Sequence, residues 1–509
     1  MKDKSASEID IQAKVSHSSL DSASNNLGVH QITSNNGEII NITDKYVDKK
    51  LERKVRLKLD LHTLPLICIL YLFNALNKGN ISNAKTNTIE ADLDITGDQW
   101  NLMLSIFYIP FVLFAFPLSL VIKRFNAARV LPVLAFTFGS INLLLVSAFN
   151  FSGLMAGRFF LGLCESAVLP GIIFYLSTFY RRHELASRLS IIYSFSSIAN
   201  AFSGLLAFGV FQIEHSVLHG WQILFLLEGS LTIVVAVCAF LFLPRDIQSA
   251  GFLTEEEKQY AQYRVETDSS AAQGGTFEFR DAIKVFRSPV TFAWLFEELC
   301  IGVPLNSINN WFPQIIQAMG KSTVQTNLYT VAPNIWGAVI LLVFAFSSDH
   351  YRVRSAFLVV AIAATLIGFV VYGAIDITKD IGVGYFACFL MTTGASASSV
   401  LTSTWYNNNT PNENRRVVIS AVGIPLANAA GLISTNIFRP KDAPKYLPAL
   451  GITAGFGGLA IVVVVGITTF MVFDNRRRDK KQGVTLKYND VPTADLREGP
   501  SNPNFRWMF

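Results

Sequence analysis

The sequence predicts an all-α membrane protein in which twelve transmembrane helices form two six-helix bundles. Three observations predict this fold class. First, 51% of the 509 residues are hydrophobic and only 16% are charged, whereas soluble domains carry about 25% charged residues. Second, apolar runs of about 20 residues, the length that crosses a bilayer, recur twelve times along the chain. Third, Lys and Arg collect on one side of the resulting helix arrangement.

The twelve expected spans are separated by short polar or charged turns. They cover approximately residues 61–82, 99–121, 129–149, 152–179, 188–212, 221–243, 289–316, 325–347, 355–377, 383–404, 417–438 and 447–473. With this count both termini lie on one side, which holds 28 Lys and Arg against six on the other. Because cytoplasmic loops carry an excess of Lys and Arg, we expect both termini in the cytoplasm. The net charge of +5 gives no reason to expect a nucleic-acid partner.

The chain is expected to divide into a cytoplasmic tail, a first bundle, a cytoplasmic linker, a second bundle and a second cytoplasmic tail, at residues 1–58, 59–243, 244–288, 289–473 and 474–509. The first tail is rich in Ser and Asn and poor in aromatic residues, which is typical of disorder. In the linker, Thr254 and Glu257 have the spacing of a capping box, so a short helix should begin there. The second tail is polar and is expected to remain unpaired.

Two charges in the fourth expected span are the leading candidates for a functional site. Arg158 and Glu165 lie seven residues apart, so they share one helix face and are separated by about 10 Å along its axis. Charged side chains at membrane depth must face protein or water, and they are functional candidates by default. Gly157 and Gly162 thin the same helix and allow close approach. The pair therefore predicts a substrate-anion site with a proton carrier beside it, or alternatively a structural ion pair.

Seven stretches in order along the chain carry a family resemblance. They are residues 76–84, 107–110, 158–171, 220–229, 405–409, 442–446 and 502–506. Together with the turn at 349–354, they resemble the major facilitator superfamily, and in finer detail the fungal allantoate-permease family of anion:cation symporters. The resemblance covers roughly residues 60–509.

The resemblance implies proton-driven uptake of a small organic anion, such as a vitamin, a ureide or a sulfur compound. It also implies that Arg158 contacts the anion and that Glu165 takes the proton. The family usually carries Asp-Arg in the first span, where this chain has Asn77 and Lys78. Lys78 keeps the positive charge as a point charge and is expected to bind substrate, although a lysine that reaches toward the membrane surface is the alternative. Asn77 cannot ionise, so the usual first-span proton site is missing.

Five further residues are candidates for the same site. Glu297 and Glu298 stand about nine residues into the seventh span, and they predict either a replacement proton carrier or, if the span starts later, an exposed flank. Tyr108, Asn309 and Trp405 can supply hydrogen bonds or an aromatic wall, because pockets combine apolar walls with a few placed polar groups.

The two halves carry similar basic turns after their second spans. Arg124 and Arg129 belong to the first turn, and Asp349 and Arg354 belong to the second. Positive residues at these places are typical of cytoplasmic anchors. Asp349 adds a carboxylate that can pair with a neighbouring basic loop, so we expect these four residues to form a gate that closes one face.

We therefore expect a proton-coupled transporter that imports a small organic anion. We expect a multi-pass monomer at the plasma membrane, with an internal membrane as the alternative, whose partners are the anion, protons and the lipid bilayer. No metal, cofactor or catalytic residue is expected, because the sequence has neither an H-E-x-x-H nor a G-x-S-x-G motif. A nutrient sensor on a transporter scaffold and an antiporter of the same fold are the alternative functions.

Overall fold

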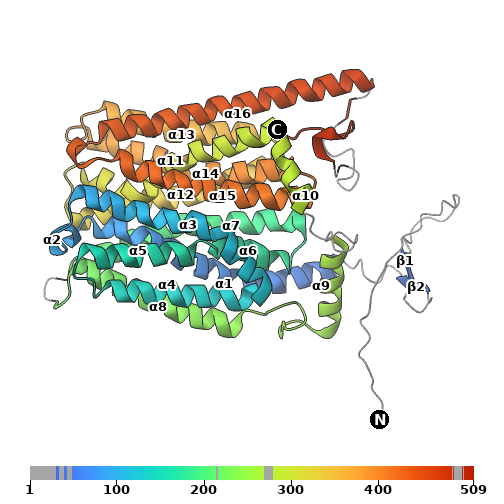
Figure 1. Ribbon diagram of the computed structural model, residues 1–509, viewed down its shortest axis with the longest axis horizontal. Coiled ribbons are helices and arrows are strands. Elements are labelled where there is room, and N and C mark those ends of the chain that lie inside the picture. The colour runs from blue at the N-terminus through green and yellow to red at the C-terminus, as the bar shows by residue number, and fades with distance from the viewer. Residues whose placement is uncertain are drawn as a thin grey trace, which may run out of the picture.

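The long helices run side by side along one axis, with the first half of the chain below the second half in the view of Figure 1. The computed structural model describes residues 30–33, 39–42, 49–213, 216–268, 279–483, 485–486, 496 and 498–509. Apart from one short strand pair, the long regular elements in these residues are helices, which confirms the predicted all-α membrane fold. Residues 273–275 of the linker, Gln-Gly-Gly, have the composition of a flexible joint and lie outside the described residues.

The first half is built from seven long helical segments and a one-turn helix: α1 (Lys49–Ala84), α2 (Ile89–Asp92), α3 (Gly97–Phe125), α4 (Ala127–Leu145), α5 (Phe151–Glu165), α6 (Val168–Ser177), α7 (Arg182–Val210) and α8 (Gly220–Phe242). The linker contains α9 (Glu255–Asp268), α10 (Phe279–Ala282) and the 3-10 helix η3 (Ile283–Arg287). The second half contains α11 (Pro289–Gln317), α12 (Thr323–Tyr351), α13 (Arg354–Ala374), α14 (Ile381–Asn408), α15 (Glu413–Ile437) and α16 (Leu447–Gln482). The short pieces are β1 (His30–Thr33), β2 (Ile39–Ile42), η4 (Pro440–Asp442) and η6 (Gly499–Ser501).

The twelve expected spans correspond to these long helices, with α5 and α6 together forming the fourth. Eleven spans in the described part of the chain are both long enough and apolar enough to cross a membrane. The twelfth, α11, has 29 residues but a more polar sequence, which includes Glu297, Glu298 and three asparagines. It packs against α1, α14, α15 and α16, so its polar side chains meet protein and not lipid.

The fourth span, expected over residues 152–179 with a bend at Pro170, is broken in the middle. α5 ends at Glu165, and α6 begins at Val168. Pro170 explains the break, because its nitrogen has no hydrogen to donate to the carbonyl of Ser166 and its ring clashes there. Glu165 therefore stands at the last turn of α5, where the helix opens.

The start of α1 and the end of α16 lie at the same end of the molecule (Figure 1). We call it the basic end, because the first turns of α1 and the last turns of α16 are rich in Lys and Arg. α1 begins at Lys49, ten residues before the expected boundary of the first bundle. Its charged first turns find partners in the linker, because Lys54 and Lys58 both pair with Glu257 of α9, at 3.1 and 2.7 Å. The predicted capping box is confirmed: the Thr254 N–H donates to Glu257, whose own N–H donates to the Thr254 hydroxyl.

The last twelve residues, 498–509, fold back onto the basic end of the second half, and we call them the C-terminal segment. The expectation that this tail stays unpaired is wrong. Trp507 is buried and its Nε1 donates to Asp474 of α16 at 2.7 Å. The Met508 carbonyl accepts hydrogen bonds from Nε1 of Trp405 on α14 and from Nδ2 of Asn409, the C-cap of that helix, at 2.8 and 2.9 Å. The segment thus connects α14 to α16.

At the end opposite the basic end, hydrogen bonds join the two halves. Asn101 of α3 donates to the Phe438 carbonyl at 3.0 Å, and Gln314 of α11 donates to the Ser82 carbonyl of α1 at 2.7 Å. Ser105 of α3 shares a 2.8 Å hydrogen bond with the Thr435 hydroxyl of α15. These contacts close the opposite end in this conformation.

Candidate functional site

Lys78 lies between the two halves and not at a membrane surface. Its Nζ donates to Oδ1 of Asn428 on α15 at 3.0 Å. The same nitrogen lies 5.7, 5.3 and 5.4 Å from the ring centres of Phe107, Tyr108 and Phe111 on α3. Aromatic faces attract cations at such distances, so α3 provides an aromatic bed that holds the ammonium group inside the protein.

Arg158 and Glu165 are both buried on α5, each with 2% of its surface exposed. The Arg158 guanidinium lies 4.7 Å from the centre of the Phe107 ring, and its Nε has no hydrogen-bond partner. Both carboxylate oxygens of Glu165 also lack a hydrogen-bond partner in the part of the chain that the structure describes. Arg158 and Glu165 are therefore not hydrogen-bonded to each other, although the Lys78 and Arg158 charges act on Glu165 through space.

Two glycines allow this arrangement. A Cβ at Gly162 of α5 would stand 2.1 Å from the Phe107 carbonyl oxygen, so only glycine lets α3 lie this close. A Cβ at Gly431 of α15 would stand 2.4 Å from the Tyr108 ring. α3 is therefore held between α5 and α15, and its aromatic residues face both Arg158 and the second half.

Tyr108 connects the two halves beside Lys78. Its hydroxyl donates to Oδ1 of Asn306 at 3.1 Å and accepts from Nδ2 of Asn310 at 2.8 Å, both on α11. Asn306 is itself held by two backbone carbonyls, Gly302 and Ala427. This amide pair fixes the Tyr108 ring, which is the aromatic face nearest to Lys78 among the three.

Asn309 lies at a second place between the halves. Its Oδ1 accepts a hydrogen bond from Asn200 of α7 at 3.2 Å. Both residues line a cavity, here called the inter-half cavity, with about 20 Å³ of space for the centres of water molecules; its other lining residues are Gly79, Ser82, Asn83, Ser203, Ile308, Phe312, Pro313, Thr330 and Asn334. This volume holds about one water. The cavity is polar and is formed by α1, α7, α11 and α12.

Glu297 and Glu298 are fully buried in α11, so the alternative of an exposed flank is wrong. Thr402 of α14 donates to Oε1 of Glu297 at 2.8 Å. The second oxygen of Glu297 and both oxygens of Glu298 have no hydrogen-bond partner among the described residues. The Glu297 carboxyl group thus faces α14, whereas that of Glu298 lies near Tyr193 of α7 and Tyr406 of α14.

Trp405 is placed away from the other predicted substrate-binding residues. Its ring packs against Trp294 with the ring centres 6.0 Å apart, and its nitrogen is bonded to the C-terminal segment. The sequence predicted either an aromatic pocket wall for Trp405 or, equally, a role in helix packing or at a span end. In the structure this side chain anchors the C-terminal segment instead.

The four predicted gate residues do not pair across the two turns. Asp349 and Arg354 form an ion pair within their own turn, whereas Arg124 and Arg129 are exposed. The Arg354 N–H also donates to the Phe509 carbonyl at 2.7 Å. In this conformation the second turn is tied to the C-terminal segment and not to the first turn.

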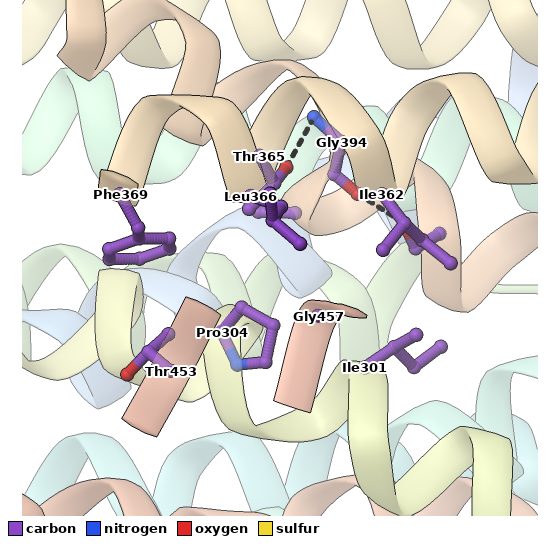
Figure 2. A pocket seen from close by; sticks show the side chains of 11 residues that line it. Ile301, Pro304, Ile362, Thr365, Leu366, Phe369, Gly394, Thr453 and Gly457 are labelled. Carbon is purple, nitrogen blue, oxygen red and sulfur yellow. Dashed lines mark hydrogen bonds between the residues drawn. The ribbon is translucent and has the colours of Figure 1, made fainter. Parts of the chain in front are cut away.

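A further small cavity lies wholly inside the second half, between α11, α13, α14 and α16 (Figure 2). Thr365 accepts a hydrogen bond from the Gly394 N–H at 3.1 Å on one side, and Phe369 and Pro304 face the space from two others. It offers about 10 Å³ for water centres and no charged side chain among its lining residues. This cavity is a packing gap and not a substrate site.

Several residues of the site were missed by the sequence prediction. Phe107 and Phe111 belong to it. They are four residues apart on α3, so both rings lie on the helix face that contacts Lys78. Asn428 and Asn310 complete the polar side. The spacing of Phe107 and Phe111 was a usable signal, but the contact of Asn428 with Lys78 spans 350 residues of sequence.

No group of three or more His, Cys, Asp or Glu that could hold a metal ion occurs within the described ranges.

The sequence is similar to known membrane transporters over most of its length. The family model of the Major Facilitator Superfamily matches residues 67–435. The uncharacterized transporter C1039.04 of Schizosaccharomyces pombe is 59% identical over 92% of this chain and 92% of its own length.

Two further relatives have more informative names. The major facilitator-type transporter hxnP of Emericella nidulans is 39% identical over 92% of this chain and 95% of its own length. The high-affinity nicotinic acid transporter of Saccharomyces cerevisiae is 27% identical over 90% of this chain and 85% of its own length. A solved structure of a bacterial homologue of the human lysosomal transporter Spinster, in an inward-facing conformation, has a TM-score of 0.61 at 14% identity, covering 83% of this chain and 98% of that one. That likeness concerns the fold.

Proposed function

We propose, since this chain belongs to the major facilitator superfamily, that it is a proton-coupled secondary transporter that imports a small organic anion. The observation that carries this proposal is the pair of cations, Lys78 and Arg158, in one site between the halves. They are held by aromatic rings and an amide, and no carboxylate forms a direct ion pair with either among the described residues. A site with two cations and one nearby carboxylate has room for one more negative charge.

The anion is expected to bind at Lys78 and Arg158. Burying a charge is costly unless it meets a partner, and hydrogen bonds between ionised groups are the strong ones. A carboxylate that enters the site would accept hydrogen bonds from the unpaired Arg158 Nε–H and from the remaining N–H donors of the Lys78 ammonium. The bound anion would thus supply the hydrogen-bond acceptors that Lys78 and Arg158 lack among the described residues.

Glu165 is the proposed proton carrier. Its carboxyl group has no hydrogen-bond partner, and the cations near it are the ones that the anion would contact. When an anion takes those cations, the negative charge on Glu165 loses its compensation, so anion binding favours proton uptake. This reciprocal linkage between two ligands is the minimum that symport requires.

The relatives suggest which anion to test first. We propose that the chain belongs to the allantoate-permease family, on the sequence stretches listed above. Nicotinate is the first anion to test, because one relative is named a nicotinic acid transporter. We further propose that the protein works as a monomer in the plasma membrane with both termini in the cytoplasm. Glu297 and Glu298 remain proposed as further proton carriers, and equal proton-to-anion ratios in E297Q, E298Q and the parent would remove them.

The test is uptake into liposomes that contain the purified protein, under an imposed pH gradient, with nicotinate and a panel of other small anions. Arg158→Ala serves as the blank and is expected to lower uptake at least about tenfold, because the cation that contacts the anion is gone. No uptake of any anion by the parent protein would overturn the proposed function.

Glu165→Gln tests the coupling. We expect this variant to keep exchange of labelled for unlabelled anion, because the cations remain. It should lose accumulation driven by the pH gradient, because glutamine carries no exchangeable acid proton. Accumulation equal to that of the parent at every pH would show that the proton travels elsewhere.

A further inference from the structure

A second buried carboxyl group lies in the first half, away from Lys78 and Arg158. Glu228 on α8 is fully buried. Its Oε1 accepts a hydrogen bond from the Ser203 hydroxyl of α7 at 3.2 Å, and Asn80 of α1 lies beside the same carboxyl group. Its Oε2 has no partner among the described residues.

The groups that face Glu228 from every packed element are neutral. Asn80 of α1 and Ser203 of α7 lie at the carboxyl group itself. Behind them, Asn142 of α4 accepts a hydrogen bond from Asn80, and Asn77 donates to Thr232, whose hydroxyl donates to the Glu228 backbone carbonyl. No Lys, Arg or His of the described chain contacts this carboxyl group. Glu165 differs, because two cations act on it. A negative charge on Glu228 would be uncompensated, which is costly in a buried place.

Ser203 connects Glu228 to the inter-half cavity. The serine lines that cavity and also donates to Glu228, while Asn83 donates to the same hydroxyl at 2.7 Å. A hydroxyl group can donate and accept at once, so it can pass a proton between a carboxyl group and a water in the cavity.

We propose that Glu228 is a second proton-carrying residue, which exchanges its proton with the inter-half cavity through Ser203. The proposal rests on the proposed function, because a proton site has a use only in a coupled transporter. In the release step the Glu228 carboxylic acid gives its proton to the Ser203 oxygen, Ser203 gives its own proton to the cavity water, and a carboxylate remains. Loading is the reverse, and it requires the opposite end to be hydrated. Glu228 would therefore carry a proton in the first half of the chain, which Asn77 cannot do because an amide does not ionise.

The experiment observes the proton directly and needs no substrate. Infrared difference spectra of the purified protein in liposomes, recorded between high and low pH, show the C=O stretch of buried carboxylic acids. We expect one such band to vanish in Glu228→Gln and to remain in Glu165→Gln and in Glu256→Gln, an exposed control on α9. In Glu228→Asp the band should shift, which covers the case in which the glutamine variant does not fold.

The relay through Ser203 is tested by measuring how fast the Glu228 carboxylic acid exchanges its proton for deuterium. Ser203→Ala keeps the carboxyl group and should keep the band. The shift of this band in heavy water should appear roughly five- to tenfold more slowly. This is the rate factor expected when the barrier to proton exchange rises by the net free energy of one hydrogen bond. A spectrum of Glu228→Gln identical to that of the parent would overturn the proposal, and unchanged exchange in Ser203→Ala would overturn the relay. Because these readouts use no anion, they stay separate from a failure of anion uptake.

Discussion

For Lys78 and Arg158, the attraction to the surrounding rings and amide is weaker than the free-energy cost of removing the two charges from water. A cation over an aromatic ring gains about 0.5–2 kcal/mol, whereas removing an ion from water costs several kcal/mol even after the protein relaxes. Lys78 has three rings and one amide, and Arg158 has one ring. Among the described residues, Glu165 is the one carboxyl group that acts on both cations, so the site has a net attraction for an anion. This excess of positive charge is the reason to expect selectivity for anions over cations.

Gly162 is the residue on which the geometry of the site depends most. We expect Gly162→Ala to push α3 away from α5, because its Cβ would stand 2.1 Å from a backbone oxygen, which cannot rotate away. Overpacking of this kind costs about 1–3 kcal/mol. The Phe107 ring would also leave its place over Arg158. We therefore expect lower thermal stability together with a loss of anion uptake.

The matched control is Gly209→Ala on α7, where a Cβ would meet nothing within 4 Å. Alanine is the better helix former by about 1 kcal/mol, so this variant should be as stable as the parent or more stable, with normal uptake. Equal effects of the two substitutions would contradict the close approach of α3 and α5. Thermal unfolding and uptake are the two measurements.

At the scale of elements, α9 is attached to the basic end by Glu257, which is 1% exposed. Burial alone raises the pKa of Glu257, but hydrogen bonds from two lysines and the Thr254 N–H outweigh it and lower the pKa to about 2. Because this value lies below the ordinary value of 4.5, the stabilisation is complete above pH 4.5 and is lost as the pH falls through about 2.

Glu257→Gln should therefore lower the midpoint of thermal unfolding by a few degrees at pH 7, since it removes the charge that Lys54 and Lys58 contact. The difference from the parent should shrink as the pH falls below about 4. Glu256→Gln changes the neighbouring, exposed residue and should have no effect at either pH. A constant difference between Glu257→Gln and the parent down to pH 2.5 would contradict the charged pairing.

The C-terminal segment contributes to the stability of the second half. Trp507 is buried against Trp294, Phe470 and Phe505, and truncation of a buried aromatic side chain to alanine costs about 3–5 kcal/mol. We expect Trp507→Ala to lower the thermal unfolding midpoint of the purified protein clearly. Ser501→Ala, an exposed position in the same segment, should leave it unchanged; an equal midpoint for Trp507→Ala would mean that the segment does not stay docked.

Periodicity and charge predicted the helices, because a bilayer imposes both signals on each span separately. Arg158 and Glu165 were found for the same reason, since a shared face of one helix depends on local spacing alone. The break after Glu165 had a local signal in Pro170 as well. The docking of the C-terminal segment had none: Met508 meets Trp405 across 103 residues, and such a contact depends on how helices pack. The misplacement of Trp405 has this same cause.

At the scale of the whole molecule, the two ends differ in how they are held. The opposite end is joined across the halves by Asn101, Gln314 and Ser105. At the basic end, ion pairs connect each half to its own part of the linker, as Glu257 does with α1 and Asp281 does with Arg415 of α15. Separation of the halves at the basic end therefore leaves these pairs intact, whereas opening of the opposite end must break the cross-half hydrogen bonds.

This asymmetry predicts the effect of a lock at the opposite end. Ser105 and Thr435 lie on different halves with their hydroxyl oxygens 2.8 Å apart, so Ser105→Cys with Thr435→Cys, in a background without the natural cysteines, should form a disulfide on oxidation. If transport requires the halves to rock about the central site, the oxidised protein should stop transporting, and reduction should restore uptake. Ser307→Cys with Thr453→Cys is the matched control, because these residues are 3.3 Å apart within the second half and a bridge between them leaves rocking free. Full uptake in the oxidised Ser105–Thr435 pair would mean that the opposite end does not open during transport, and that the anion and the proton reach Lys78, Arg158 and Glu165 by another route.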